Sequence, residues 1–356
     1  MTVFVSYSAP DDLAAPTPDR TDSTSDSTHP AAPPEGARKA QSAVLTALTR
    51  CVNRKALSTV VVVLLAAMSI GITGCERILT QSCAPSSLSP FPNGPRQTVL
   101  PITVHEVGGV AVDTAGSVYA TDWGCYAGGS AGTFVGVQVV KLAPGSSSQT
   151  VLPFTGLNGL GSVAVDTAGN VYVTNASDNR VRKLGAGSHS QTVLPFTDLH
   201  HPAGVAVDRA GNVYVTDEIN ARVVKLAPGS NAQTVLPFSD LHDPTGVAVD
   251  SSGNVYVSDN RVVTLAPGSN TQTVLPFTGL DHPEGLAVDG AHNVYLADTR
   301  NNRVLKLPAG SGAQTLLQFS GLNQPRAVAV DNAGNVYANT FDADFDSYYV
   351  LKLAAG

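Results

Sequence analysis

From Gln97 onward, short apolar segments alternate with polar turns at a nearly constant spacing. Each unit contains a small apolar segment that ends in Asp, a V-Y step, a segment of the R-V-V-K-L type and a segment of the Q-T-V-L-P type. The Asp recurs at intervals of 53, 42, 42, 39 and 42 residues, at Asp113, Asp166, Asp208, Asp250, Asp289 and Asp331. Short apolar segments separated by turn residues at such a period are typical of a β-propeller.

The third unit shows how these segments predict four strands. We expect strands over Gly204–Asp208, Val213–Asp217, Arg222–Leu226 and Gln233–Phe238, since apolar and polar residues alternate within the segments and turn residues separate them. The first Q-T-V-L-P segment precedes the first apolar segment, and the chain ends after the sixth K-L, Lys352-Leu353. The sequence therefore predicts an all-β fold: a six-bladed β-propeller over 97–356, with four antiparallel strands per blade and the segment at Gln97 closing the ring.

The residues before the repeats predict three further regions. We expect a disordered leader over 1–45, because it is rich in Pro, Ser, Thr and Asp without an apolar period. Residues 46–75 combine basic residues with the apolar run 56–72, which is typical of an export signal or a membrane anchor. Residues 76–96 are rich in Ser and Pro and predict a tether.

The apolar run allows two interpretations. The sequence Ile-Thr-Gly-Cys that ends at Cys75 resembles a bacterial lipobox, which predicts cleavage and lipidation at Cys75. The unusually long leader favours instead a retained single-pass anchor or a later true start. Either interpretation places the repeats in the cell envelope, on the extracytoplasmic face of the plasma membrane.

Composition limits the classes of partner. The net charge is -7, which argues against a nucleic-acid partner, and only 14% of the residues are charged. The four cysteines match no zinc-site spacing, although Cys83 and Cys125 would both face the oxidising side and are candidates for a disulfide. No G-x-S-x-G or H-E-x-x-H motif occurs. We expect a monomer.

The repeated phrases Q-T-V-L-P-F-T-G-L, G-V-A-V-D, G-N-V-Y-V-T-D and R-V-V-K-L-A-P-G-S resemble the NHL-repeat family. They are similar in particular to the extracellular sensor propeller of mycobacterial receptor serine/threonine kinases of the PknD type, over 97–356. Residues 1–55 contain no Gly-rich loop with Lys, no H-R-D and no D-F-G. The resemblance therefore implies a sensor architecture without the kinase domain.

Two irregular loops predict a recognition surface. In a blade, the connection from the fourth strand to the next blade and the loop between the second and third strands share one face. The second loop is long in blade 1 and unusual in blade 6, and ring closure makes these blades neighbours. The loops carry exposed aromatic and acidic candidates for ligand or protein binding: Trp123, Tyr126, Phe134, Phe341, Phe345, Tyr348, Asp342, Asp344 and Asp346. Alternatives are loops that only cover the closure seam, disordered loops, or a Ca²⁺ site at the three Asp, which lacks the Gly and Glu of an EF-hand loop.

The connections between blades predict a polar channel mouth on the same face. Its candidate residues are Glu106, His201, Asp243, His282, Glu284, Gln324 and Arg326. Three of these, Glu106, His201 and His282, come from blades 1, 3 and 5 and are candidates for a divalent-metal site. The alternative is that the loop residues are merely solvated. No other cofactor is expected.

Together these features predict a non-catalytic, membrane-anchored sensor or adhesion module that binds a small ligand, a peptide or a surface protein. The alternative function is a metal-dependent propeller lyase or lactonase that uses the channel-mouth residues.

Overall fold

The computed structural model describes residues 96–127, 133–342 and 347–356, all within a structural unit that spans 78–356. The predicted leader, the signal or anchor segment and all of the tether except Arg96 lie outside these residues. No helix within the described part of the chain has the length and hydropathy needed to cross a membrane.

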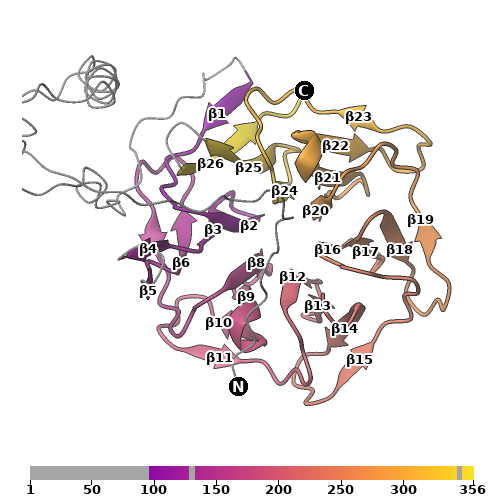
Figure 1. Ribbon diagram of the computed structural model, residues 1–356, viewed down its shortest axis with the longest axis horizontal. Helices are drawn as coiled ribbons and strands as arrows, with labels where there is room; N and C mark the ends of the chain where they lie inside the picture. The colour runs from indigo at the N-terminus through magenta and orange to yellow at the C-terminus, as the bar shows by residue number, and fades with distance from the viewer. Residues whose placement is uncertain (1–95, 128–132, 343–346) are drawn as a thin grey trace, which may run out of the picture. The chain divides into compact units, whose positions relative to one another are not determined.

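The predicted six-bladed propeller is confirmed (Figure 1). Six four-stranded antiparallel sheets surround a central channel, and each sheet runs from an inner strand at the channel to an outer strand at the rim. Blade 1 consists of β2 (Val107–Val112), β3 (Val118–Asp122), β6 (Gln138–Leu142) and β7 (Thr150–Val151). Blade 2 consists of β8 (Leu160–Val165), β9 (Val171–Asn175), β10 (Arg180–Leu184) and β11 (Gln191–Val193). Blade 3 consists of β12 (Pro202–Val207), β13 (Val213–Asp217), β14 (Arg222–Leu226) and β15 (Gln233–Val235).

Blades 4 and 5 consist of β16 (Val247–Val249), β17 (Val255–Ser258), β18 (Val262–Leu265) and β19 (Thr273–Val274); and β20 (Pro283–Val288), β21 (Val294–Asp298), β22 (Arg303–Leu307) and β23 (Thr315–Leu316). Blade 6 contains β24 (Val328–Val330), β25 (Val336–Asp342) and β26 (Ser347–Leu353), and its outer strand is β1 (Gln97–Val99). Gln97 pairs with Leu353, so the N-terminal strand closes the ring as predicted. In blade 3 the two middle strands have the predicted bounds, while the outer strand is shorter than predicted.

The core lies between stacked blades. The second strands, such as β13, are buried on both faces because each blade is covered by its neighbours. The inner strands are crowded, and a Cβ on Gly204 would lie 2.5 Å from the carbonyl oxygen of Thr245 in the next blade. Glycine at this position therefore allows the close approach of adjacent inner strands.

The turns on one face of the ring are held by a repeated contact between Asp and Tyr. In blade 3 the Asp208 carboxylate accepts hydrogen bonds from the Tyr214 hydroxyl at 3.0 Å and from the Asn212 side chain at 2.7 Å. Burial and the nearby carboxylate raise the pKa of Tyr214, and the Lys225 ammonium lies 5.3 Å from the centre of its ring. The same Asp–Tyr hydrogen bond occurs in all six blades, so this face is uniform scaffold.

Candidate functional site

The opposite face opens into a cavity at the mouth of the central channel. The cavity has a volume of about 340 Å³. Its wall consists largely of small residues of the inner strands, including Gly161, Gly204, Gly246 and Gly285. Six aromatic, imidazole or charged side chains also line it: Trp123, His201, Glu218, His282, Glu284 and Arg326.

Three pairs of side chains carry the charge at this mouth. His201 Nδ1 lies 2.7 Å from Glu218 Oε2, and His282 Nδ1 lies 3.2 Å from Glu284 Oε1. Arg326 Nη1 donates to Glu106 Oε1 at 3.0 Å across the seam between blades 6 and 1. Each basic group thus faces one carboxylate, and the pairs come from blade 3, blade 5 and the closure seam.

The predicted metal trio is not assembled. The structure pairs Glu106 with Arg326, His201 with Glu218 and His282 with Glu284, so none of the three faces the other two. Throughout the described ranges, no group of three His, Cys, Asp or Glu residues is placed to hold a metal ion. The structure therefore does not bring Glu106, His201 and His282 together as one metal-binding group.

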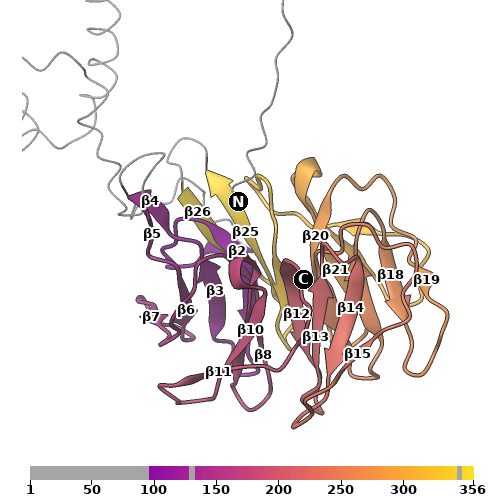
Figure 2. The same ribbon diagram turned by 60° about the horizontal axis from the view of Figure 1, so that its bottom comes forward.

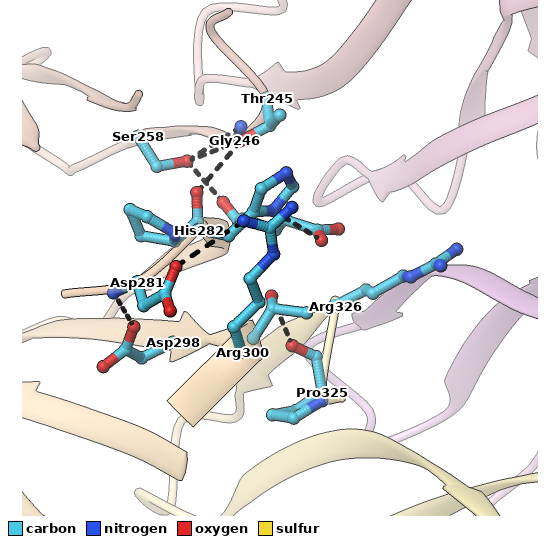
Figure 3. A network of polar contacts seen from close by, with 12 residues as sticks. Thr245, Gly246, Ser258, Asp281, His282, Asp298, Arg300, Pro325 and Arg326 are labelled. Carbon is cyan, nitrogen blue, oxygen red and sulfur yellow. Dashed lines mark hydrogen bonds and ion pairs between the residues drawn. The ribbon is translucent and has the colours of Figure 1, made fainter. Parts of the chain in front are cut away.

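Burial distinguishes Glu284 from the other carboxylates of the mouth. Desolvation raises the pKa of Glu284, although the charges of Arg326 and His282 oppose this shift. Figure 3 shows polar contacts in this part of the mouth, in which the Asp281 amide donates to Asp298 and the Gly246 amide donates to Ser258. The Ser258 hydroxyl in turn donates to the Glu284 carbonyl. The Glu284 carboxyl thus lies in a site that favours its neutral form more than water does.

Buried Asp residues at the ends of the second strands hold the loops that form the mouth. Asp217 accepts a hydrogen bond from the His200 amide at 2.6 Å and from Arg222 Nε at 2.7 Å. Asp298 is likewise bound by Arg303 Nε at 2.6 Å. These contacts fix the loop, and the next residue, His201, adopts the left-handed conformation with φ of 59°. Both arginine contacts are ion pairs that span the hairpin between the second and third strands of their blade.

The remaining channel-mouth candidates lie at the edge of the cavity or outside it. Asp243 and Gln324 occupy the same loop position as His201 and His282, but they are exposed and do not line the cavity. Glu106 reaches the mouth through its bond to Arg326. The loop position before the recurring Pro thus lies on the face of the cavity, as predicted. The direction of each side chain from its loop decides whether the residue lines the cavity.

The predicted aromatic patch divides into two parts. Phe341 and Tyr348 face each other in the extended hairpin of blade 6, with ring centres 5.0 Å apart, and Tyr348 packs against the core cluster at the seam. Trp123 packs instead against the cluster between blades 1 and 2 and lines the cavity. Asp342 is buried, with 8% of its surface exposed. The seam-cover alternative thus describes Phe341 and Tyr348 better than an exposed patch does.

The insertion of blade 1 forms a small hairpin of β4 (Cys125–Ala127) and β5 (Thr133–Val135), in which Tyr126 pairs with Phe134. Figure 2 shows this hairpin and the extended hairpin of blade 6 at the same edge of the molecule. The candidates Asp344, Phe345 and Asp346, the lipidation site Cys75 and the disulfide candidate Cys83 lie outside the described residues. Their roles stay predictions.

Glu218 is a cavity residue that the repeat pattern did not predict. It follows the last residue of β13, and the matching positions in the first two blades are Trp123 and Ala176, which also line the cavity. A comparison of the six copies at this single position shows Glu218 as its one charged residue. Asn339, behind the cavity wall, replaces the hydroxyl residue that four blades carry near the end of their second strand, and its Oδ1 accepts from the amides of Arg326 and Ala327.

Comparison with known proteins identifies the repeats. The family model described as NHL repeat matches residues 199–226, 241–262 and 280–307, so the chain contains NHL repeats. A segment of 65 residues is 49% identical to the serine/threonine-protein kinase PknD of Mycobacterium tuberculosis. This match covers 17% of the chain and 8% of the kinase. The similarity predicted from the repeat phrases is therefore confirmed for one segment.

Solved structures share the fold at low identity. A chain of a nidogen/laminin complex is 22% identical, with a TM-score of 0.53 over 60% of this protein and 85% of that chain. A streptogramin B lyase is 13% identical, with a TM-score of 0.53 and coverage of 72% and 96%. Virginiamycin B lyase from Staphylococcus aureus is 11% identical, with a TM-score of 0.52 and coverage of 73% and 99%. At these identities the likeness shows the propeller fold alone.

Proposed function

We propose that this protein is an extracytoplasmic NHL propeller, anchored to the membrane by its N-terminal region, that binds a ligand through the channel-mouth face without catalysing a reaction. The single observation that carries the proposal is the cavity of about 340 Å³ with its three charge pairs. Concave sites of this size with a few converging polar groups are typical of small-molecule binding. The uniform Asp–Tyr turns of the opposite face offer no comparable variation.

The kinship with PknD supports a sensor-like role in the envelope. It is limited to a short segment, so the location rests mainly on the export or anchor pattern of residues 46–75. Intact-mass analysis of the protein isolated from membranes tests this part of the proposal. A mass that corresponds to a diacylated chain beginning at Cys75 supports the lipoprotein form, and an uncleaved mass supports the retained anchor. Recovery of the chain only from the cytosol would reject both.

The alternative function, a metal-dependent lyase or lactonase, requires a metal-binding group. Its three predicted ligands, Glu106, His201 and His282, are each paired with a different side chain. The channel mouth retains imidazole and carboxyl groups, which are equally suited to bind a polar ligand. Binding therefore explains the described cavity with fewer requirements than catalysis.

Native mass spectrometry of the full chain tests the binding function. The wild type is incubated with the low-molecular-mass fraction of an envelope extract and compared with Glu218→Gln/Arg326→Gln. We expect an added mass on the wild type that the double variant lacks, and an unchanged compound after release. Arg300→Gln is the matched control, because Arg300 forms an exposed ion pair with Asp281 outside the cavity. Equal added mass on all three proteins, or a chemically altered compound, would contradict the proposal.

A further inference from the structure

The inner strands give the cavity at the channel mouth an aliphatic lining. Each blade contributes one aliphatic residue to it from the same position of the repeat: Val110, Val163, Val205, Val247, Leu286 and Val328. Residues next to them in the lining, such as Gly204 and Gly246, are small. An alkyl chain in this cavity would lie against apolar groups, which removes its surface from water.

Backbone amides of this lining are already used within the protein. In four blades the amide of a lining residue donates to a side-chain oxygen of the second strand at 2.7–2.8 Å: Ser162 to Thr174, Gly204 to Thr216, Gly246 to Ser258 and Ala327 to Asn339. The Arg326 guanidinium also has an acceptor, since it donates to Glu106 at 3.0 Å. These amides therefore offer no free donor to a negatively charged ligand, and the guanidinium has a carboxylate of its own.

Two carboxylates of the lining are accessible to a cation. Glu218 lies 2.7 Å from His201, and its side chain is 26% exposed. Glu284 lies 3.2 Å from His282, and its side chain is 20% exposed. An imidazole carries a positive charge only when it is protonated. While both imidazoles are neutral, each carboxylate therefore has a neighbouring imidazole but no counter-charge from it.

Acidification makes this mouth more positive. Other charged groups near the two imidazoles are the ion pairs of Arg326 with Glu106, of Arg300 with Asp281 and of Arg222 with Asp217. Arginine and carboxylate side chains ordinarily keep their charge between about pH 5 and about pH 7.5, whereas imidazoles, among them His200 beside His201, take up protons in this range. Burial raises the pKa of Glu284, so this carboxyl too loses negative charge as pH falls.

We propose that the channel mouth binds a small aliphatic amine or diamine while its two imidazoles are neutral. The alkyl chain would lie against the aliphatic lining, and the ammonium groups would donate to Glu218 and Glu284. Protonated His201 and His282 would compete for the same carboxylates and would weaken binding. The inference deepens the proposed function and rests on it. The cavity volume of about 340 Å³ accommodates a ligand of this size.

Calorimetry of the full chain at about pH 7.5 tests the ligand class with 1-butylamine and 1,4-diaminobutane. 1-Butanol is the control for the alkyl chain alone, and butyrate reverses the charge. We expect the amines to bind and both controls to bind at least about tenfold more weakly, because the controls lack the charge-assisted contact. Binding of butanol or butyrate as tightly as the amines would overturn the inference, and so would the failure of both amines to bind at millimolar concentration.

Glu218→Gln removes one carboxylate charge and retains the shape of the side chain. We expect its affinity for the better-binding amine to fall at least about tenfold. Arg300→Gln, which changes an exposed ion pair outside the cavity, should alter this affinity less than about twofold. The unfolding temperature of each variant checks that the fold is retained. Unchanged affinity of Glu218→Gln would contradict the role of its carboxylate.

The pH dependence tests the part played by the imidazoles. Wild-type affinity should fall at least about tenfold between about pH 7.5 and about pH 5, and the fall should be smaller in His201→Gln/His282→Gln, whose amides donate hydrogen bonds without titrating. An equal fall in both proteins, or none in the wild type, would contradict the inference. If an envelope compound adds mass to the wild type while no amine binds, the proposed function stands and only this inference fails. If nothing binds, both fail.

Discussion

Removal of one side chain at the closure seam tests how the ring is held shut. Gln97 donates from Nε2 to the Ser320 carbonyl at 3.0 Å and accepts from the Ser320 amide at 2.7 Å. Three residue pairs join β1 to β26, and flanking backbone hydrogen bonds join Leu100 to Val350 and Ala354 to Arg96. The Gln97 side chain adds two hydrogen bonds to this short ladder, and it is buried, with 4% of its surface exposed.

For Gln97→Ala we expect a loss of about 2–4 kcal/mol in the free energy of unfolding. Two hydrogen bonds of about 1 kcal/mol each are lost, and removal of the buried Gln97 side chain leaves a space at a cost of about 1–2 kcal/mol. In a domain of this size the unfolding temperature would fall by roughly 5–12 °C. Circular dichroism during heating and urea titration measures both quantities.

Gln233→Ala is the matched control for this prediction. Gln233 forms the same two bonds to Thr197, at 2.9 and 3.0 Å, but it is partly exposed and joins segments of the continuous chain. We expect it to lose only about 0.5–1.5 kcal/mol, because water replaces the lost contacts. Equal destabilisation by the two substitutions would refute the reasoning that burial at the seam sets the cost.

Three further predictions concern stability. Gly246→Ala should lose about 1–3 kcal/mol, since its Cβ would overlap a carbonyl of the next blade, whereas Gly312→Ala, with open space around it, should be nearly neutral in the same urea titration. Arg182→Ala should lose about 2–4 kcal/mol because its guanidinium is buried and ion-paired, while the exposed Arg180→Ala should be nearly neutral by the same measurement. The unfolding temperature of Glu284→Gln should rise relative to that of the wild type as pH increases from about 4 to about 7, because the raised pKa makes ionisation of Glu284 unfavourable in the folded state only. A difference in unfolding temperature that stays constant across this pH range would contradict the prediction.

The local rules of the repeat were readable from sequence because they depend on neighbours along the chain. The turn after Asp208, the bounds of β13 and β14 and the pair of Asp217 with Arg222 all involve residues a few positions apart. Blade 2 shows the limit of this reasoning. There the buried guanidinium comes from Arg182 and pairs with Asp178, whereas Arg180, which matches Arg222 of blade 3 in the repeat, is exposed. Both positions are local, and packing between blades selects between them.

The repeat, the number of blades and the closure of the ring follow from the amino-acid pattern, because each blade buries the same apolar residues against its neighbour. Which side chains meet at the channel mouth depends instead on how the folded ring brings distant loops together. Glu106 and Arg326 are 220 positions apart, and their contact depends on the closed ring and on the direction that each side chain takes from its loop. The same geometry gives the three expected metal ligands separate partners. Among the described residues it also leaves Asn339 Nδ2 without an acceptor. The period of a repeat fixes the position of a backbone but not the partner of a side chain.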